Sequence, residues 1–332
     1  MKKIIFTLFV AFLATIAVQA QQISVVSTTG ATKLFRTLPD AINGADPGSV
    51  IYLPGGGFTI SDDVKITKKL TIIGIGHYVK SDNVDGNTTI GGNLCFQEGS
   101  SGSAVLGCYI TGNVDIGGDG KAVSDVLIRY CNLNAVVVHT NLCKETIVNQ
   151  NYIREISDFY GSNAEVTNNI MHSIFDLDDG KIVNNVILHT AYVQAYGHRY
   201  YLSNSGPFGY CERTQIMNNV LRAANERWYN DSSNALSGNL AVGTDVVEHN
   251  LGADVDWNDV FVNYNNATIS PESDFPFSEK YKEYESKVGI YAGTSFNPSQ
   301  MEPVPYISHK DIPQETDAQG MLNVKIRVKA NK

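Results

Sequence analysis

The sequence predicts an all-β fold, a parallel β-helix, from a repeat of short apolar segments and from the turn residues that separate them. Most segments recur about twenty residues apart, too short a period for helical repeats, and they lack the leucine-rich signature. Such a period matches one solenoid coil, whose short strands stack about 4.8 Å above those of the previous coil. Aligned, the repeats place one column at Cys108, Cys131, Asn151, Asn169, Asn185, Asn219, Asn239 and Asn250.

The asparagines of this column predict a structural ladder rather than a catalytic group. Side-chain amides stacked on successive coils can bond to one another and to turn backbone that burial would leave unsatisfied. Turns rich in Gly, Asp, Asn and Ser, such as GGDG at 117–120 and LDDG at 177–180, supply the tight corners that a coil requires.

The N-terminal region predicts a short capping helix followed by strands. In TLPDAIN, Thr37 is a candidate N-cap with Asp40 three residues later, and Pro39 suits the first turn. This order of helix and strands resembles the pectin-lyase-like, right-handed parallel β-helix family over roughly residues 35–265. The matching positions are Ala41, Ile42, Pro47, Gly48, Ile51, Tyr52, Leu53, Pro54, Gly57, Ile60 and the run from Leu70 to Gly76. The resemblance implies the fold, whereas the family's members include lyases, glycosidases, esterases and adhesins.

Beyond about residue 265 the composition becomes rich in Pro, Ser and charge, and residues 317–332 read as a terminal strand. The segment 289–293, GIYAG, resembles the ending of secreted Bacteroidetes β-helix proteins. We therefore expect residues 21–265 to form the β-helix with its N-terminal cap and residues 266–332 to cap its other end. A sorting or partner-binding tail is the alternative.

Residues 1–20 predict a cleaved signal peptide. Lys2 and Lys3 precede an apolar run that ends in Val18-Gln19-Ala20, so cleavage is expected before Gln21. The alternative, a membrane anchor, requires a longer apolar run, and no cysteine follows the cleavage site to carry a lipid. We expect a secreted, periplasmic or cell-surface protein with no membrane span.

The composition and charge of the chain restrict the classes of partner that it is expected to bind. The chain of 332 residues is 43% hydrophobic and carries 25 Lys and Arg against 34 Asp and Glu, with no basic cluster. This balance argues against a nucleic-acid binder, and we expect a monomer. Its five cysteines include no CxxC pair and no metal-binding spacing, so buried free thiols are expected, with one disulfide as the alternative.

Candidate ligand contacts gather in the one interval of the repeat that is nearly doubled in length, between Asn185 and Asn219. Long loops on a repeat scaffold are often functional, aromatic rings stack on sugars, and arginine matches uronate carboxylates. The alternative is that these aromatics form an apolar lid on the solenoid. We predict catalytic roles for His198, Arg199 and Arg213, and substrate contacts from Tyr192, Tyr196, Tyr200, Tyr201, Arg222 and Arg227.

A candidate calcium site follows from the register. Asp158 and Asp176 stand seven residues after the column on adjacent coils, while Phe159 and Leu177 are expected to point inward. Two outward carboxylates about 5 Å apart share a proton, bind a cation or turn into solvent. Together with Asp178 they suit calcium, and the alternative is a solvated acidic edge without metal.

These features predict a β-helix protein that engages a polysaccharide, either as a lyase on uronate polymers or as a catalytically weak binder. A lyase requires a cation to neutralise the uronate and a base to remove the ring proton. An inverting glycosidase requires carboxylates farther apart than adjacent coils give, and the triple-Asp motif of pectin hydrolases is absent. Because no lyase motif matches residue by residue, a structural or adhesive surface protein is the alternative.

Overall fold

The computed structural model describes most of the chain from residue 22 to residue 330. Outside the description lie the predicted signal peptide and most of the long interval. The described ranges are 22–60, 63–78, 86–160, 163–188, 208–209, 211–222, 233–242, 249–251, 255–262, 275–293, 296, 305–311, 313, 319, 321 and 324–330; side chains at 157, 158, 208, 209, 249, 250, 305, 306 and 330 are not described.

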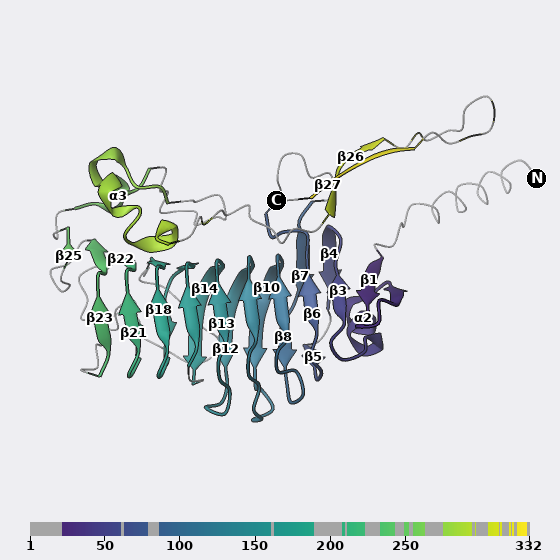
Figure 1. Cartoon of the computed structure of the whole chain (residues 1–332), viewed down its shortest axis with the longest axis horizontal. Helices are drawn as coiled ribbons and strands as arrows, with labels where there is room; N and C mark the ends of the chain where they lie inside the picture. The colour runs from purple at the N-terminus through teal and green to yellow at the C-terminus, as the bar shows by residue number, and fades with distance from the viewer. Residues whose placement is uncertain are drawn as a thin grey trace, which may run out of the picture.

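One sheet, sheet A, runs the length of the molecule as a stack of three-residue strands in parallel register (Figure 1). At its N-terminal end two antiparallel strands, β1 (Ile23–Val26) and β2 (Thr32–Phe35), extend it. The parallel strands are β3 (Val50–Tyr52), β6 (Thr71–Ile73), β9 (Ala104–Leu106), β11 (Leu127–Arg129), β13 (Ile147–Asn149), β15 (Glu165–Thr167), β18 (Lys181–Val183), β21 (Gln215–Met217) and β23 (Ala235–Ser237).

The second sheet, sheet B, has two arms, because the long central strands pair with one set of short strands through their first residues and with another through their last. The long strands are β10 (Tyr109–Ile116), β12 (Asn132–Val138) and β14 (Tyr152–Phe159). Their first residues continue the first arm: β4 (Gly56–Thr59), β7 (Thr88–Gly91), β16 (Ile170–Met171), β19 (Val186–Ile187), β22 (Val220–Arg222), β24 (Leu240–Val242) and β25 (His249–Asn250). Their last residues continue the second arm: β5 (Val64–Ile66), β8 (Leu94–Phe96), β17 (Ile174–Phe175) and β20 (Phe208–Gly209).

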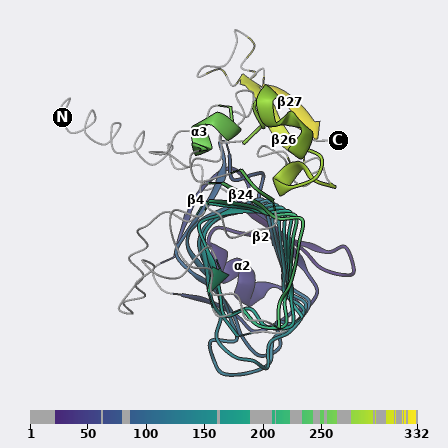
Figure 2. The same ribbon diagram turned by 90° about the vertical axis from the view of Figure 1, so that its left-hand side faces the viewer.

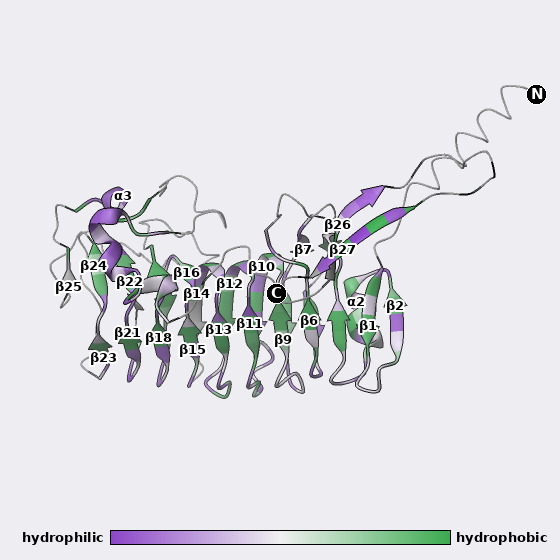
Figure 3. Ribbon diagram, turned by 45° about the horizontal axis from the view of Figure 1, so that its top comes forward, coloured by the Kyte–Doolittle hydropathy of each residue, from purple (hydrophilic) through white to green (hydrophobic). Residues whose placement is uncertain are grey.

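Each turn of the chain visits sheet A, the first arm and the second arm, and returns one coil further along (Figure 2). This path is a right-handed parallel β-helix, which confirms the predicted fold class. Figure 3 shows hydrophobic residues concentrated in the strands and hydrophilic ones at the coil corners. Within each coil, the sequence therefore alternates apolar strand residues with polar corner residues, as the repeat predicted.

The predicted capping helix is α2, Leu38–Gly44. The Asp40 backbone N–H donates to the Thr37 hydroxyl at 3.2 Å, and that hydroxyl donates to the Asp40 carboxylate at 2.6 Å. Leu38, Ala41 and Ile42 are buried, so the helix covers the N-terminal end of the solenoid core. Figure 2 shows α2 lying across the end of the solenoid when the coils are viewed along their axis.

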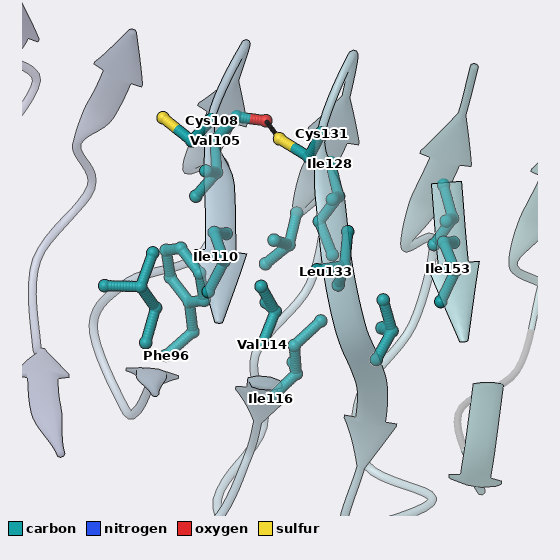
Figure 4. Packing of buried hydrophobic residues seen from close by; sticks show 14 of the residues in the cluster. Phe96, Val105, Cys108, Ile110, Val114, Ile116, Ile128, Cys131, Leu133 and Ile153 are labelled. Atoms are coloured by element: carbon teal, nitrogen blue, oxygen red, sulfur yellow. Dashed lines mark hydrogen bonds between the residues drawn. The ribbon is translucent and has the colours of Figure 1, made fainter. Parts of the chain in front are cut away.

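Inward-facing side chains fill the solenoid in stacked rows (Figure 4). Rows form because in-register parallel strands place equivalent residues directly above one another, and close packing of aliphatic groups then stabilises neighbouring coils. All five cysteines are buried and none is part of a disulfide, which agrees with the buried-thiol interpretation. The Cys131 thiol donates to the Val105 carbonyl at 3.6 Å and to the Arg129 carbonyl at 3.2 Å.

The asparagine column forms a continuous ladder at the corner between sheet A and the first arm. Each amide oxygen accepts from the backbone N–H of the column residue one coil earlier, at 2.8–3.0 Å. Each amide nitrogen donates to a backbone carbonyl and, in all but the last, to the next amide oxygen. The ladder residues are Asn151, Asn169, Asn185, Asn219 and Asn239, preceded by Thr88, Cys108 and Cys131 in the same register.

One predicted member of the column is wrong. The pairing of β24 with β25 places Asn250 opposite Ala241, two residues beyond Asn239, so Asn250 is not in the register of the column. The final step of the repeat is shorter than a regular coil, and alignment by residue type alone chose the nearest asparagine.

The residue before each column member from Cys108 to Asn239 adopts a left-handed conformation. Asn168, Asn184 and Asn218 have φ between 55° and 59°, and Gly107 and Gly238 have φ of 65°. Asparagine and glycine tolerate this region better than other residues, which explains the Asn-Asn pairs of the repeat: the first turns the chain and the second builds the ladder.

The C-terminal segment lies along the outer face of the first arm and contributes α3 (Trp257–Val260) and the 3-10 turns η1 (Glu279–Tyr284) and η2 (Gly289–Tyr291) (Figure 1). Its aromatic residues join a second apolar cluster with the outward-facing column Tyr152, Ile170, Val186, Val220 and Leu240. A two-stranded hairpin, β26 (Pro305–Asp311) and β27 (Lys325–Ala330), follows. In the described part of the chain, no helix has the length and apolarity to cross a membrane.

Candidate functional site

The three outer faces of the solenoid differ in what they leave accessible. The C-terminal segment covers the first arm over the coils from Tyr152 to Leu240. Sheet A presents a mixed face that includes the exposed Lys181–Glu165 pair at 2.6 Å. The second arm and its bordering corners carry a series of acidic, imidazole and guanidinium side chains, so we take this face as the candidate site.

The residues of the second-arm face come from alternating strand positions and from the corners at both strand ends. Val114, Val136, Ile156 and Ile174 are in register and belong to the core, so the residues on either side of them face outward. These neighbours and corner residues, from β10 to β17, are Asn113, Asp115, Ala135, Val137, His139, Arg154, Glu155, His172, Ser173, Phe175 and Asp176.

The best-defined polar contact on this face joins Asp115 of β10 to His139, which follows β12 on the next coil. His139 Nε2 lies 2.9 Å from Asp115 Oδ1; the Asp115 side chain is 14% exposed and that of His139 is 41% exposed. The Cys95 thiol lies 3.8 Å from the other carboxylate oxygen. Burial, and then the negative charge of Asp115, raise the pKa of Cys95 to about 12, so this thiol is protonated and not a nucleophile.

Two further polar residues on the face are buried although they point away from the core. Glu155 is 8% exposed and Ser173 is 1% exposed, and the register places them side by side on β14 and just before β17. The corner residues beside them, Arg154 and His172, are more accessible. A carboxylate, a hydroxyl, a guanidinium and an imidazole thus occur within two coils.

The predicted carboxylates Asp158 and Asp176 leave regular strand geometry at equivalent places. Val137 pairs with Ser157 and Val138 pairs with Phe159, so Asp158 is the extra residue of a β-bulge. Asp176 has a φ of 62°, and both Phe159 and Leu177 point into the core as predicted. Bulges re-aim side chains and often border functional sites. The Asp158 side chain itself lies outside the description.

The predicted residues Asp178 and Arg213 are brought together with two more carboxylates at the corner beyond the second arm. Arg213 binds Asp179 through Nε at 2.8 Å and Glu212 through Nη1 at 2.9 Å, and its Nη2 lies 3.4 Å from Asp178. Asp179 and Arg213 both occupy left-handed corner positions, with φ of 51° and 50°, on successive coils. Stacking of equivalent corners therefore creates this ion-pair network.

Electrostatics give the members of this network different protonation behaviour. Hydrogen bonding from Arg213 lowers the pKa of Asp179, whereas burial, opposed by Arg213, raises the pKa of Asp178. Hydrogen bonds to Asp179 and Glu212 raise the pKa of Arg213. A guanidinium held in its charged form suits neutralisation of an anion better than removal of a proton.

The other predicted contacts are only partly placed. Arg222 ends β22 on the first arm and is partly buried there, away from the second-arm face. His198, Arg199, Tyr192, Tyr196, Tyr200, Tyr201 and Arg227 lie outside the described residues, so their roles stay predictions. Within the described ranges, no group of three or more His, Cys, Asp or Glu side chains converges as a metal site, and Asp178 is already engaged by Arg213.

Sequence reasoning missed the Asp115–His139 pair and the Glu155–Ser173 neighbours. The rule that found Asp158 and Asp176, seven residues past the column, also selects Asp115 when counted from Cys108. In the next coil the same count reaches the buried Val138, because a register shift between Ile110 and Asn113 pairs Asp115 with Val137. The sequence contained the signal for Asp115, but only the strand pairing shows that His139 meets it.

No protein-family model matches the sequence, and no curated protein matches it. Among solved structures, a mutant of the PL6 family alginate lyase AlyGC resembles the chain at 12% sequence identity and a TM-score of 0.27. The alignment covers 83% of this chain and 58% of that chain. The β-helix fold of this protein rests on its own strand pairing.

Proposed function

We propose that this protein binds a polysaccharide along the second-arm face of sheet B. The observation that carries the proposal is the concentration of hydrogen-bonding and ionisable side chains on consecutive coils of that face, while the C-terminal segment covers the first arm. Coils stacked about 4.8 Å apart present similar positions repeatedly, which suits a ligand that itself repeats. In the sequence, the 190–213 interval stands between β19 and β21 and includes β20, which pairs with β17.

The proposed ligand is an acidic polysaccharide of the uronate class. The arginine cluster at Arg213 supplies fixed positive charge, and Arg199 and Arg227 are further candidate partners for carboxylates. The tyrosines at 192, 196, 200 and 201 are proposed to stack on sugar rings. His198 and Arg199, with Arg213, stay our candidates for chemistry within the interval.

Calcium is the cofactor that we propose for binding, because the chain is acidic and so is the ligand. Asp158 and Asp176, each two residues after the paired Ile156 and Ile174, are the carboxylates that we assign to it. Asp178 was predicted as a third ligand, and its use requires that its contact with Arg213 opens. A bound calcium ion would supply positive charge that neutralises uronate carboxylates.

The second candidate function is a structural or adhesive surface protein without catalysis. The observation that favours it is the commitment of Arg213 to three carboxylates, with a raised pKa that keeps it charged. In either case we propose that the protein acts as a monomer after export, in the periplasm, at the cell surface or outside the cell.

The test is direct binding to a panel of neutral and uronate polysaccharides, with calcium or with a chelator. We expect uronate polymers to bind and the chelator to weaken them, and we expect Asp176→Asn to reproduce the chelator's effect. Glu165→Gln, on the opposite sheet, is the matched control and should bind normally. Equal affinity for neutral and uronate polymers would overturn the uronate assignment, and failure to bind any polymer would overturn the proposed function.

A further inference from the structure

We propose that the C-terminal hairpin of β26 and β27 is a docking surface for a membrane whose lipids carry anionic headgroups. The hairpin belongs to neither apolar core and extends away from the stacked coils (Figures 1 and 3). The inference goes beyond the proposed function, because it requires neither the second-arm face nor a polysaccharide.

One face of the hairpin is apolar and uncovered. Ile326 and Val328 lie on the same face of β27, and the antiparallel register places Ile307 opposite Val328. Ile326 is 53% exposed and Val328 is 58% exposed, although such alternation is typical of a strand with one buried face. Figure 3 shows hydrophobic and hydrophilic residues alternating along the hairpin. A two-stranded hairpin is only marginally stable in water, so cover for this face would stabilise it.

The opposite face of β27 is basic. Lys325, Arg327 and Lys329 occupy alternate positions, so cations that apolar residues separate in the sequence form one exposed row on the strand. Within the described ranges, neither Lys325 nor Arg327 forms an ion pair. The one carboxylate of the two strands is Asp311, which lies opposite Lys325 at the end of β26. This cationic surface belongs to a chain whose formal net charge is −9.

A membrane with anionic lipids matches both faces at once. Amphipathic segments at membrane surfaces bury their apolar side chains at the boundary between headgroups and acyl chains, and their cations are attracted to anionic headgroups. An acidic polysaccharide would engage the cations but would leave Ile326 and Val328 in water. The combination of charge with an exposed apolar face therefore favours the lipid surface.

A second copy of the hairpin is a poorer match. If two β27 strands paired antiparallel through their free edges with Ile326 opposite Val328, Lys325 of one copy would face Lys329 of the other. Like charges directly opposite each other destabilise a strand pair, and lysines on an edge strand oppose such pairing. The lysines thus disfavour self-association and leave the apolar face for a partner of opposite charge.

The test is sedimentation with vesicles of phosphatidylglycerol and phosphatidylcholine, compared with vesicles of phosphatidylcholine alone. The chain should begin at Gln21, because the apolar run of residues 1–20 would itself bind vesicles and the described fold begins at residue 22. We expect binding to the anionic vesicles. Binding should weaken as salt rises, because the Debye length shortens from about 10 Å at 0.1 M to about 3 Å at 1 M.

Substitutions on each face test the two contributions separately. Lys325→Gln combined with Arg327→Gln should lower the affinity for anionic vesicles about 25-fold, since each cation contributes a factor of about five. Ile326→Ser combined with Val328→Ser should lower it at least tenfold, because the apolar contact is lost.

Two control variants should bind like the unmodified chain. Lys325→Arg combined with Arg327→Lys keeps both charges on the hairpin. Lys181→Gln removes one cation from sheet A, away from the hairpin.

The outcomes separate this inference from the proposed function. Equal binding to neutral and anionic vesicles, or full binding by either face variant, overturns the proposal. Hairpin substitutions that weaken binding to uronate polymers but not to vesicles would make the hairpin a polysaccharide contact, and dimerisation that these substitutions abolish would make it a self-association surface. Either result overturns the membrane assignment. Failure to bind vesicles leaves the polysaccharide proposal standing, because the second-arm face is unaltered.

Discussion

A single ladder asparagine satisfies four buried groups at once, and its loss is therefore expected to be costly. The Asn169 oxygen accepts from the backbone and side-chain nitrogens of Asn151, and its nitrogen donates to the Val148 carbonyl and to Asn185. Asn169→Leu removes all four of these hydrogen bonds and leaves the buried Asn151 backbone N–H without its acceptor, so we expect a loss of about 3 kcal/mol or more in the free energy of unfolding. Urea denaturation measures it. Asn149→Ala, which loses only a partly buried contact with Thr167, should cost less than about 1 kcal/mol.

The ion-pair network around Arg213 contains two carboxylates whose pKa values are shifted in opposite directions, and removal of Arg213 should affect both. Arg213→Met should return the pKa of Asp179 upward toward its ordinary value and raise that of Asp178 further, since Arg213 lowers both. The folded-state pKa of Asp179 is depressed, so its contribution to stability is present above the usual Asp pKa, about 3.9, and disappears as the pH falls through the depressed value. Carboxyl NMR titration measures both groups. Unchanged titration of Asp179 in the variant would contradict the assigned cause.

At the residue scale, the sequence predicted the side chains that recur once per coil, such as the ladder asparagines. It did not predict contacts that depend on how neighbouring strands pair. The ladder from Asn151 to Asn239 was predictable because each coil requires the same corner chemistry. Thr88 escaped notice because its hydroxyl, which accepts from the Ile75 N–H, performs the same task without resembling asparagine. The Asp115–His139 contact joins adjacent coils whose register shifts between Ile110 and Asn113, so residue counting could not predict the contact.

At the scale of elements, one glycine fixes the C-terminal segment to the solenoid. Gly289 has a φ of 74°, donates its N–H to the Asn218 carbonyl, and would bring an added Cβ to 3.0 Å from Val220. Gly289→Ala combines left-handed strain with this close contact, so we expect a loss of about 1–3 kcal/mol and faster proteolysis of the segment. Gly293 has the same φ but its added Cβ would meet only Asn184 at 3.7 Å. Gly293→Ala should therefore show the strain alone, and equal effects at both glycines would disprove a packing role for Gly289.

Elements with local signals were predicted from sequence, and elements defined by distant partners were not. The helix at Leu38–Gly44 follows from its cap and from proline in the first turn. The division of sheet B into two arms does not, because β10, β12 and β14 run through the bend as continuous strands. The contact of Trp257, Phe277, Ile290 and the other described cluster residues with five coils also has no local signal in the sequence. The outward apolar residues alternate with the inward ones, so both sets resemble ordinary core residues.

At the scale of the whole molecule, the solenoid and its C-terminal segment form two cores that share one sheet. The first arm is apolar on both faces: Ile153, Met171 and Ile187 point inward, and their neighbours Tyr152, Ile170 and Val186 point toward the segment. Removal of the C-terminal segment exposes each of these outward side chains to water, at a cost of roughly 1.5–3 kcal/mol for each side chain that becomes fully exposed. A β-helix cut after residue 251 would thus present a continuous apolar stripe across five coils.

We therefore expect a chain that ends at residue 251 to associate or to bind a hydrophobic dye, even where its far-ultraviolet spectrum stays β-rich. Exposed apolar stripes on parallel coils favour stacking between copies, because they combine a large patch with neighbouring unpaired strand edges. A chain that ends at residue 304 is the matched control: it loses the hairpin of β26 and β27, whose residues are not part of the second apolar cluster. Size-exclusion chromatography with light scattering should show a monomer for the longer chain and larger species for the shorter one. A monomeric, dye-negative shorter chain would mean that the segment is dispensable and that the first arm is stable with one face in water.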